Sequence, residues 1–185
     1  MTTFDENFVL QCKSGDKKAQ KMLFERMYAP MFRVCMRYLS QHADAEDCLM
    51  LGFMKVFKNI ELFQFNGESS LSVWIRKIMV NEALMFIRQK KNLMFVVEET
   101  TTDVPMEAEI INSMEAEELN YHIMQLPSGY RTVFNLNVIE GYDHKEIASL
   151  LNISEVTSRS QLAKAKRKLR NMISQTTSSY GEQGE

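Results

Sequence analysis

Residues 143–173 contain the pattern that most restricts how this chain folds. Asp143 is followed three residues later by Glu146, a pairing typical of a helix that caps its own first turn. Asn152 to Ser154 supplies a tight turn in which Ile153 can point inward, and Ser154 can cap a second, longer helix. The apolar side chains of the two helices are Ile147, Ala148, Leu150, Leu151, Leu162, Ala165, Leu169 and Ile173. A short helix, a three-residue turn and a long helix in this order predict a helix-turn-helix.

The second helix of this motif is strongly basic on its other side. From Glu155 to Ile173 it carries six basic residues and one acidic residue, Glu155. A solvated basic face would explain the charges alone, but the preceding cap, short helix and turn favour contact with DNA. Arginine can read guanine edges, lysine near the helix end suits phosphate, and hydroxyls near the helix start suit phosphate as well. The predicted contacts are Ser154, Thr157, Arg159, Ser160, Gln161 and Lys164.

Composition extends the helical prediction to the whole chain. Among 185 residues there are only 7 Gly and 3 Pro, and 45% of residues are hydrophobic. Few helix breakers and many Met, Leu, Lys and Glu favour an all-α protein. The length allows one large domain or two small domains of about 80 residues each.

The charges divide the chain into blocks. Residues 1–91 carry 14 basic and 10 acidic side chains, residues 92–119 carry 8 acidic and no basic ones, and residues 120–172 carry 8 basic and 4 acidic ones. Two basic blocks are therefore joined by an acidic connector, although the net charge of the chain is only −2. We expect domains at residues 1–92 and 115–174, a flexible acidic linker at 93–114 and a disordered tail at 175–185.

The first block predicts several helices. Asp16 can cap a helix that runs through Tyr28, and Pro30 suits the first turn of a further helix that ends near Leu39. Another helix begins at Ala43 or Asp44 and runs to about Asn59, and a long one spans residues 70–91. In the second block, helical propensity returns near Glu107 and continues to Gln125, and a helix starting near Pro127 ends before Gly141.

The segment between the helices of the first block has two interpretations. Residues 63–70 contain a Gly and small polar side chains and predict a loop, with Trp74 close behind it. An ordinary turn with a core Trp would explain these residues. A pocket for an unstacked base would need the same ingredients: a Gly-permitted backbone, amide and hydroxyl groups, and nearby aromatic rings.

The Met-rich run from Met50 to Met54 also has two interpretations. Core packing accounts for part of it, but five apolar or small positions in a row surround a helix, so some must point outward. An outward Met is a pliable contact surface for a partner protein. The acidic residues before it, Asp44 and Asp47 among them, are explained by the helix dipole.

Other functional classes find no support in the sequence. Cys12, Cys35 and Cys48 are far apart, make no metal-ligand spacing with the three histidines, and are expected to be buried thiols of a cytoplasmic protein. We predict no metal and no cofactor. No catalytic motif, membrane span or signal peptide is found, so we expect neither an enzyme nor direct membrane insertion.

Taken together, these residues resemble the small two-region sigma factors of the extracytoplasmic-function group in the sigma-70 family. The resemblance covers about residues 16–91 and 115–173. The matching segments are Asp44–Asp47 with Phe53–Asn59, then Phe65–Asn81 with Ile87–Arg88, and in the second block Leu126–Phe134, Ile139–Gly141, Glu146–Ala148 and Leu151–Ser154. The resemblance implies a region 2-like helical bundle and a region 4-like helix-turn-helix.

The resemblance also implies roles and partners. Asp44, Asp47, Met50 and Met54 would bind core RNA polymerase. Promoter DNA would be read at its −10 element by Phe65, Asn66, Gly67, Glu68, Ser69 and Asn81, and at its −35 element by the predicted contacts of the helix-turn-helix. The acidic linker would thread towards the active-site channel of the polymerase, and an anti-sigma factor would hold the protein inactive.

The chain departs from the family pattern at four places. Met50 and Leu51 stand where Gln and Glu are common, which makes the polymerase contact more apolar. Met85 replaces a common Asp, and Val156-Thr-Ser158 replaces a Gly-Thr-Val opening of the recognition helix. Ser158 falls on the inward stripe of that helix, so the helix is expected to seat slightly differently.

The sequence therefore predicts a sigma factor that opens promoters by capturing unstacked bases, with two rivals. One is a helix-turn-helix regulator that binds duplex DNA without polymerase. The other is a sigma-like decoy that sequesters an anti-sigma factor.

Overall fold

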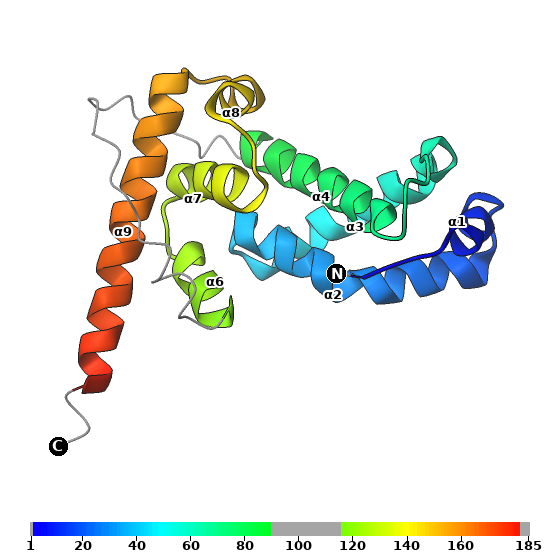
Figure 1. Cartoon of the computed structure of the whole chain (residues 1–185), viewed down its shortest axis with the longest axis horizontal. Coiled ribbons are helices and arrows are strands. Elements are labelled where there is room, and N and C mark those ends of the chain that lie inside the picture. The colour runs from blue at the N-terminus through cyan, green and yellow to red at the C-terminus, as the bar shows by residue number, and fades with distance from the viewer. Residues whose placement is uncertain (1, 90–115, 182–185) are drawn as a thin grey trace. The chain divides into compact units, whose positions relative to one another are not determined.

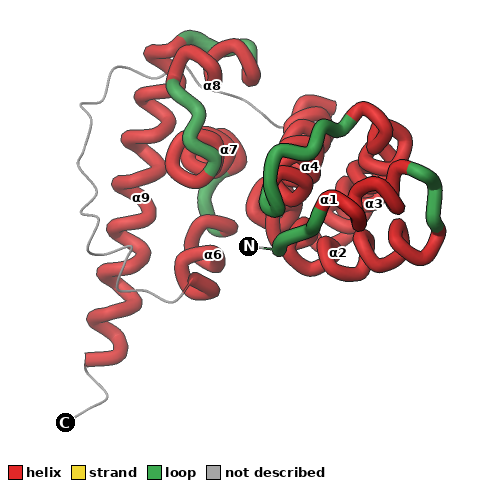
Figure 2. Tube along the Cα trace, turned by 45° about the vertical axis from the view of Figure 1, so that its right-hand side comes forward, coloured by secondary structure: helices red, strands yellow, loops and turns green. Residues whose placement is uncertain are grey.

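The computed structural model describes the backbone of residues 2–89 and 116–181, and the side chains of residues 2–89 and 118–174. The chain divides into two compact units on either side of Lys90. Within the two described ranges every regular element is a helix, and the segments between them are loops (Figure 2). The predicted all-α, two-domain architecture is confirmed. The whole of the predicted linker at 93–114 lies outside the described residues, and so does the helix start near Glu107.

The first unit is built on three long helices. They are α2 (Lys17–Leu39), α3 (His42–Asn59) and α4 (Ser70–Gln89), and they pack against one another, while α1 (Glu6–Lys13) packs against α2 (Figure 1). A short 3₁₀ turn, η1 (Ile60–Leu62), follows α3 directly. The core consists of side chains at helical spacing, including Leu23, Met27, Val34, Tyr38, Leu49, Phe53, Val56, Leu71, Ile75 and Met79. Burial of this apolar area is the main source of the unit's stability.

The prediction of a helix break at Pro30 is wrong, because Pro30 lies inside α2. A proline inside a helix removes a backbone hydrogen bond and costs about 3 kcal/mol. Four buried residues on both sides of it, Leu23, Met27, Met31 and Val34, form one continuous stripe. Their burial against α3 and α4 offsets that cost, so the helix continues through the proline.

The inner face of α4 is wider than a single stripe. Trp74 and Ile78 are half-buried, and the fully covered apolar residues are Leu71, Ile75, Met79, Val80, Ala83, Leu84 and Ile87. Glu82 is buried too, because its carboxylate forms an ion pair with Lys55 of α3. This pair satisfies a charge that would otherwise be costly inside the unit.

Gly52 lets α3 and α4 approach closely. A Cβ at this position would overlap the sulfur and methyl group of Met79, which is fully buried. Glycine in a helix interior is unfavourable by about 1 kcal/mol relative to alanine. The close contact between the two helices explains why a glycine stands here.

The second unit contains α6 (Ala116–Met124), α7 (Ser128–Phe134), a π-helical turn η2 (Asn135–Ile139), α8 (His144–Leu151) and α9 (Glu155–Gly181). Helix α9 contacts α6, α7 and α8. Gly141, which was expected to end the helix before it, has a φ of +80°, a value that glycine adopts without strain.

Arg131 fastens α6 to α7. Its side chain is buried and donates hydrogen bonds to the carbonyl oxygens of Met124 at 2.8 Å and Leu126 at 3.2 Å. Met124 is the last residue of α6 and Leu126 lies just beyond it, so neither carbonyl accepts a hydrogen bond within α6. Burial lowers the pKa of Arg131 from its usual value, and the carbonyl dipoles hold the charge in place.

Helix α9 is longer than expected. It was predicted to end near Ile173, with a disordered tail from residue 175, but its backbone is helical to Gly181. Once a helix is nucleated, each further residue adds one backbone hydrogen bond at small entropic cost, so polar residues can extend it.

The three cysteines are buried and unpaired, as the sequence predicted. Burial and the nearby Asp16 carboxylate raise the pKa of Cys12 to about 11. A hydrogen bond with Cys35, together with burial, raises the pKa of Cys48. All three therefore behave as small apolar side chains of the core.

Gly52→Ala should lower the free energy of unfolding of the full chain by about 1–3 kcal/mol, because the new methyl group displaces Met79. Urea titration followed by circular dichroism measures the change. In a Met79→Ala background the same substitution should become neutral or stabilising by up to about 1 kcal/mol, since only the helix propensity of alanine then remains. Equal destabilisation in both backgrounds would contradict the close contact.

Candidate nucleic-acid interface

The helix-turn-helix in the second unit begins with the predicted capping box. The Asp143 carboxylate accepts from the Glu146 amide at 2.7 Å, and the Asp143 amide donates to the Glu146 carboxylate at 2.8 Å. Asn152 ends α8 in the left-handed conformation with a φ of 54°. The Ser154 hydroxyl accepts from the Thr157 amide at 3.0 Å, so Ser154 caps α9 as predicted.

Ser158 fixes the start of α9 against α8. It is fully buried, and its hydroxyl lies 2.9 Å from Nδ1 of His144 at the beginning of α8. The inward position predicted for Ser158 is confirmed. Ser158 departs from the family pattern, and its hydroxyl forms a hydrogen bond between the two helices that an apolar side chain could not form.

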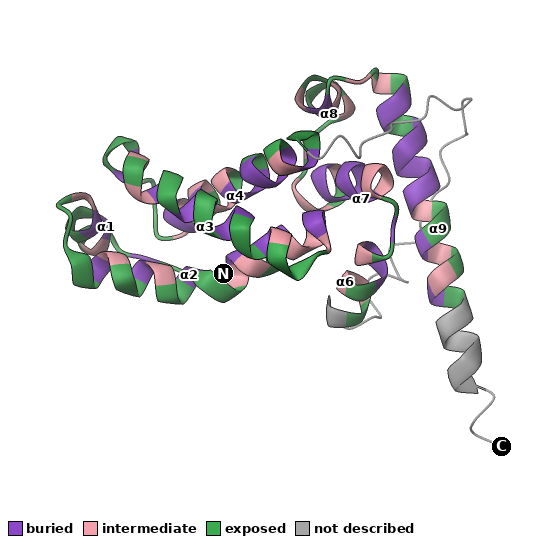
Figure 3. Ribbon diagram, turned by 180° about the vertical axis from the view of Figure 1, so that it is seen from behind, coloured by how far each residue is buried: buried purple, intermediate pink, exposed green. Residues whose placement is uncertain are grey.

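The predicted DNA contacts of α9 differ in exposure. Arg159 is exposed and pairs with Glu155 one turn earlier at 3.0 Å, and Ser154 is exposed as well. The other four, Thr157, Ser160, Gln161 and Lys164, are less than a tenth exposed. The expectation that all six side chains are accessible on one face of α9 is wrong. Over the part of α9 that Figure 3 shows in purple, polar residues are buried as well as those of the apolar stripe.

A cationic pocket lies further along α9. It has a volume of about 430 Å³ and is lined by Tyr130, Lys164, Arg167, Lys168, Asn171 and Met172. Arg167 and Lys168 are exposed. Three cations around one pocket can attract a phosphate group, and phosphate contact by the lysines near the end of this helix stays a prediction.

In the first unit, the predicted base-capturing loop is held by Ser70. The Ser70 hydroxyl donates to the Gly67 carbonyl at 2.6 Å and accepts from the Asn66 amide at 3.1 Å. Gly67 has a φ of +92°, which disfavours any other residue there. Asn66 and Glu68 are exposed, whereas Phe65 and Ser69 are half-buried.

Two aromatic residues that flank the loop in the sequence pack against each other. Phe63 is buried and packs against Trp74 with the ring centroids 5.2 Å apart. Asn81 is exposed on α4, eleven residues beyond Ser70, or roughly 16 Å along the helix axis. It therefore extends the surface that begins at the loop and does not belong to the loop itself.

The N-terminal segment also holds the loop, which sequence reasoning missed. The Phe4 amide donates to the Glu68 carbonyl at 2.9 Å, and the Ser72 hydroxyl donates to the Thr2 carbonyl. Phe4 itself is 3% exposed. Phe4 lies directly before Asp5, whose carboxylate caps α1 by accepting from the Phe8 amide, and this pattern indicates packing near α1. Nothing local indicates the contact with Glu68.

The surface predicted to bind polymerase is apolar and exposed. Met50, Leu51 and Met54 of α3 are 51%, 46% and 67% exposed. Asp47 is exposed and Asp44 is half-buried at the start of the same helix. The outward orientation of the methionines is thereby settled, because Ala45, Leu49, Phe53 and Val56 fill the inner face of α3.

Comparison with known proteins places both units in one family. Residues 23–93 match Sigma-70 region 2, and residues 117–169 match Sigma-70 region 4. The chain is 28% identical to the ECF RNA polymerase sigma-E factor of Haemophilus influenzae, covering 91% of this chain and 95% of the relative. It is 26% identical to the ECF RNA polymerase sigma factor SigW of Bacillus subtilis, covering 89% and 94%.

A solved structure shares the fold. CnrH, determined in complex with the cytosolic domain of CnrY, aligns with a TM-score of 0.50 at 17% identity, over 92% of this chain and 97% of that one. The chain belongs to the sigma-70 family, in its extracytoplasmic-function group. Among the described residues, no helix is long and apolar enough to cross a membrane, and no cluster of His, Cys, Asp and Glu could hold a metal ion.

Phe4→Ala should loosen the loop, because the buried ring anchors the amide that donates to Glu68. We expect backbone amides around Ser70 to exchange with solvent roughly tenfold faster, the effect of losing about one hydrogen bond. Hydrogen exchange followed by mass spectrometry measures this. Leu10→Ala, at an exposed position of α1, is the control and should leave the exchange unchanged. Unchanged exchange in Phe4→Ala would show that the N-terminal segment does not support the loop.

Proposed function

We propose that this sigma factor directs promoter-specific initiation by binding core RNA polymerase through α3 and reading two promoter elements with its two units. The observation that carries the proposal is the loop at residues 65–69. Its backbone is fixed by Ser70 and by Phe4, while the Asn66 and Glu68 side chains remain exposed. A rigid loop with exposed amide and carboxylate groups beside aromatic rings suits capture of an unstacked base.

Capture of unstacked bases would supply the energy for opening the duplex. Extruding a base costs a few kcal/mol, and the loop would recover that cost through hydrogen bonds and stacking. The protein therefore needs no nucleotide hydrolysis of its own, which agrees with a role as an initiation factor and not as an enzyme. Asn81, exposed on α4, would meet the same strand further along.

Helix α9 would read the −35 element. Arg159 is exposed, and its ion pair with Glu155 is a surface pair of the kind worth about 1 kcal/mol or less, so DNA can replace it at little cost. Within the described residues, the Gln161 side-chain oxygen is buried without a hydrogen-bond partner. A buried unsatisfied acceptor costs about 1–3 kcal/mol. Exposing Gln161 to a base edge would remove that cost, which favours an open form of α9 on DNA.

We also propose that a protein partner of the anti-sigma kind controls the factor. CnrH, which shares this fold, was solved in complex with another protein, the cytosolic domain of CnrY. The exposed methionines of α3 give a partner an adaptable apolar surface. An anti-sigma factor that covers this surface would compete directly with polymerase.

Run-off transcription tests the function. Core RNA polymerase from the organism that encodes the chain is incubated with genomic DNA fragments, with and without the protein. New start sites that depend on the protein are expected, and their alignment gives the promoter. If no transcript appears and the protein does not co-purify with core polymerase, a polymerase-independent helix-turn-helix regulator becomes the better account. A decoy for an anti-sigma factor becomes the better account if charge reversal at Arg159 and Lys164 leaves function intact.

Met54→Glu should weaken binding to core polymerase by about tenfold, because a charge would replace the most exposed of the apolar side chains on the proposed surface. Fluorescence anisotropy of labelled protein titrated with core polymerase measures the affinity. Leu10→Glu places the same charge at a position of similar exposure on α1 and should leave the affinity unchanged. Equal affinities for both variants would remove α3 from the interface.

A further inference from the structure

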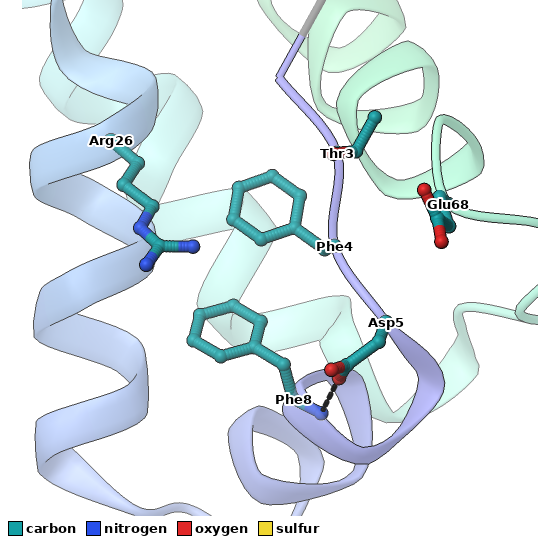
Figure 4. A pocket seen from close by; sticks show the side chains of 6 residues that line it. All are labelled: Thr3, Phe4, Asp5, Phe8, Arg26 and Glu68. Carbon is teal, nitrogen blue, oxygen red and sulfur yellow. Dashed lines mark hydrogen bonds between the residues drawn. The ribbon is translucent and has the colours of Figure 1, made fainter.

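A pocket lies beside the base-capturing loop, on the side facing the N-terminal segment. It has a volume of about 350 Å³ and is lined by Thr3, Phe4, Asp5, Phe8, Arg26 and Glu68 (Figure 4). Four parts of the chain meet there: the N-terminal segment, α1, α2 and the loop. Only Glu68 was among the residues singled out from the sequence.

One side of the pocket is a layered stack. The rings of Phe4 and Phe8 are stacked, with centroids 5.1 Å apart and an interplanar angle of 18°. The Arg26 guanidinium carbon lies 5.8 Å from the centroid of Phe8. Phe4 is buried and holds the stack, Phe8 is half-buried, and Arg26 is exposed. Nucleic-acid bases stack on both aromatic rings and guanidinium planes.

The other side of the pocket carries hydrogen-bond acceptors. Figure 4 shows the Asp5 and Glu68 carboxylates approaching from the side opposite to Arg26. One Asp5 oxygen accepts from the Phe8 amide at 2.7 Å, which leaves acceptor capacity on that carboxylate. Glu68 uses its backbone carbonyl to accept from Phe4, so this contact does not occupy its carboxylate. Carboxylates of this kind accept from the exocyclic amino groups of bases, as they do from cytosine N4.

We propose that this pocket holds a second unstacked nucleotide, next in the strand to the base captured by the loop, whose base carries an exocyclic amino group. Glu68 belongs to both the loop and the pocket, so a strand leaving the loop on this side passes over the pocket. The base would stack on Arg26 and Phe8, and the carboxylates would accept from its amino group. The inference rests on the proposed function.

The test uses holoenzyme containing the full chain and a promoter mapped by run-off transcription, with its −10 region pre-opened by mismatches. Single abasic sites are placed at successive positions of the non-template strand, and open complexes are counted by filter binding. For the wild-type factor, two neighbouring positions should each lower the yield by about tenfold, the effect of losing one stacked base. Arg26→Gln and Phe8→Leu should each remove the sensitivity at one of the two positions and leave the other unchanged. Lys21→Gln, at another exposed cation of α2, is the matched control and should keep both.

The outcomes separate the two proposals. If the wild-type factor forms no open complexes on the pre-opened promoter, the proposed function fails and this inference fails with it. If only one position is sensitive, or if Arg26→Gln and Phe8→Leu keep the wild-type profile of two positions, base capture by the loop stands and the second pocket is refuted. Each variant should unfold at the same temperature as the wild type. This control shows that lost sensitivity results from the change in the pocket and not from misfolding.

Discussion

The close approach of α3 and α4 at Gly52 is the constraint on which the first unit depends. Because Met79 occupies the space that a side chain at position 52 would take, the two helices are locked at short distance. The ion pair between Lys55 and Glu82 spans the same two helices. The loop at residues 63–69 connects η1 to α4, so the position of the candidate base-binding loop follows from how α3 and α4 pack.

The sequence predicted what short-range chemistry determines. The capping box of Asp143 and Glu146, the cap at Ser154 and the inward Ser158 all follow from interactions within one or two helical turns, and all are present. Pro30 did not end the helix, although the sequence predicted that it would. The free-energy cost of a proline inside a helix is local, whereas the buried stripe of α2 is stabilised by packing among three helices. Local rules hold until tertiary burial outweighs them.

Contacts between distant parts of the chain were beyond the sequence. The segment from Thr2 to Asp5 is mostly polar, yet it contacts Glu68 and Ser72. The hydrogen bond from the Ser72 hydroxyl to the Thr2 carbonyl joins residues that are 70 positions apart in the sequence. The burial of Thr157 and Gln161 is another case, because helical periodicity assigned them to the outer face. Periodicity predicts which residues share a face of a helix, but not how many faces are covered.

The two candidate DNA-binding surfaces differ in how they are prepared for a ligand. The loop at residues 65–69 is held by hydrogen bonds from Ser70 and Phe4, so little conformational entropy remains to be lost when a base binds. On α9, by contrast, the buried Gln161 side-chain oxygen has no hydrogen-bond partner among the described residues, and Arg159 forms only a weak surface ion pair. Both groups could form more favourable interactions if α9 contacted DNA. A rigid site favours selection among unstacked bases, whereas a site with unsatisfied groups favours rearrangement on contact. On the proposed function, the first unit would therefore discriminate among bases, and the second would adapt its surface to the duplex that it docks on.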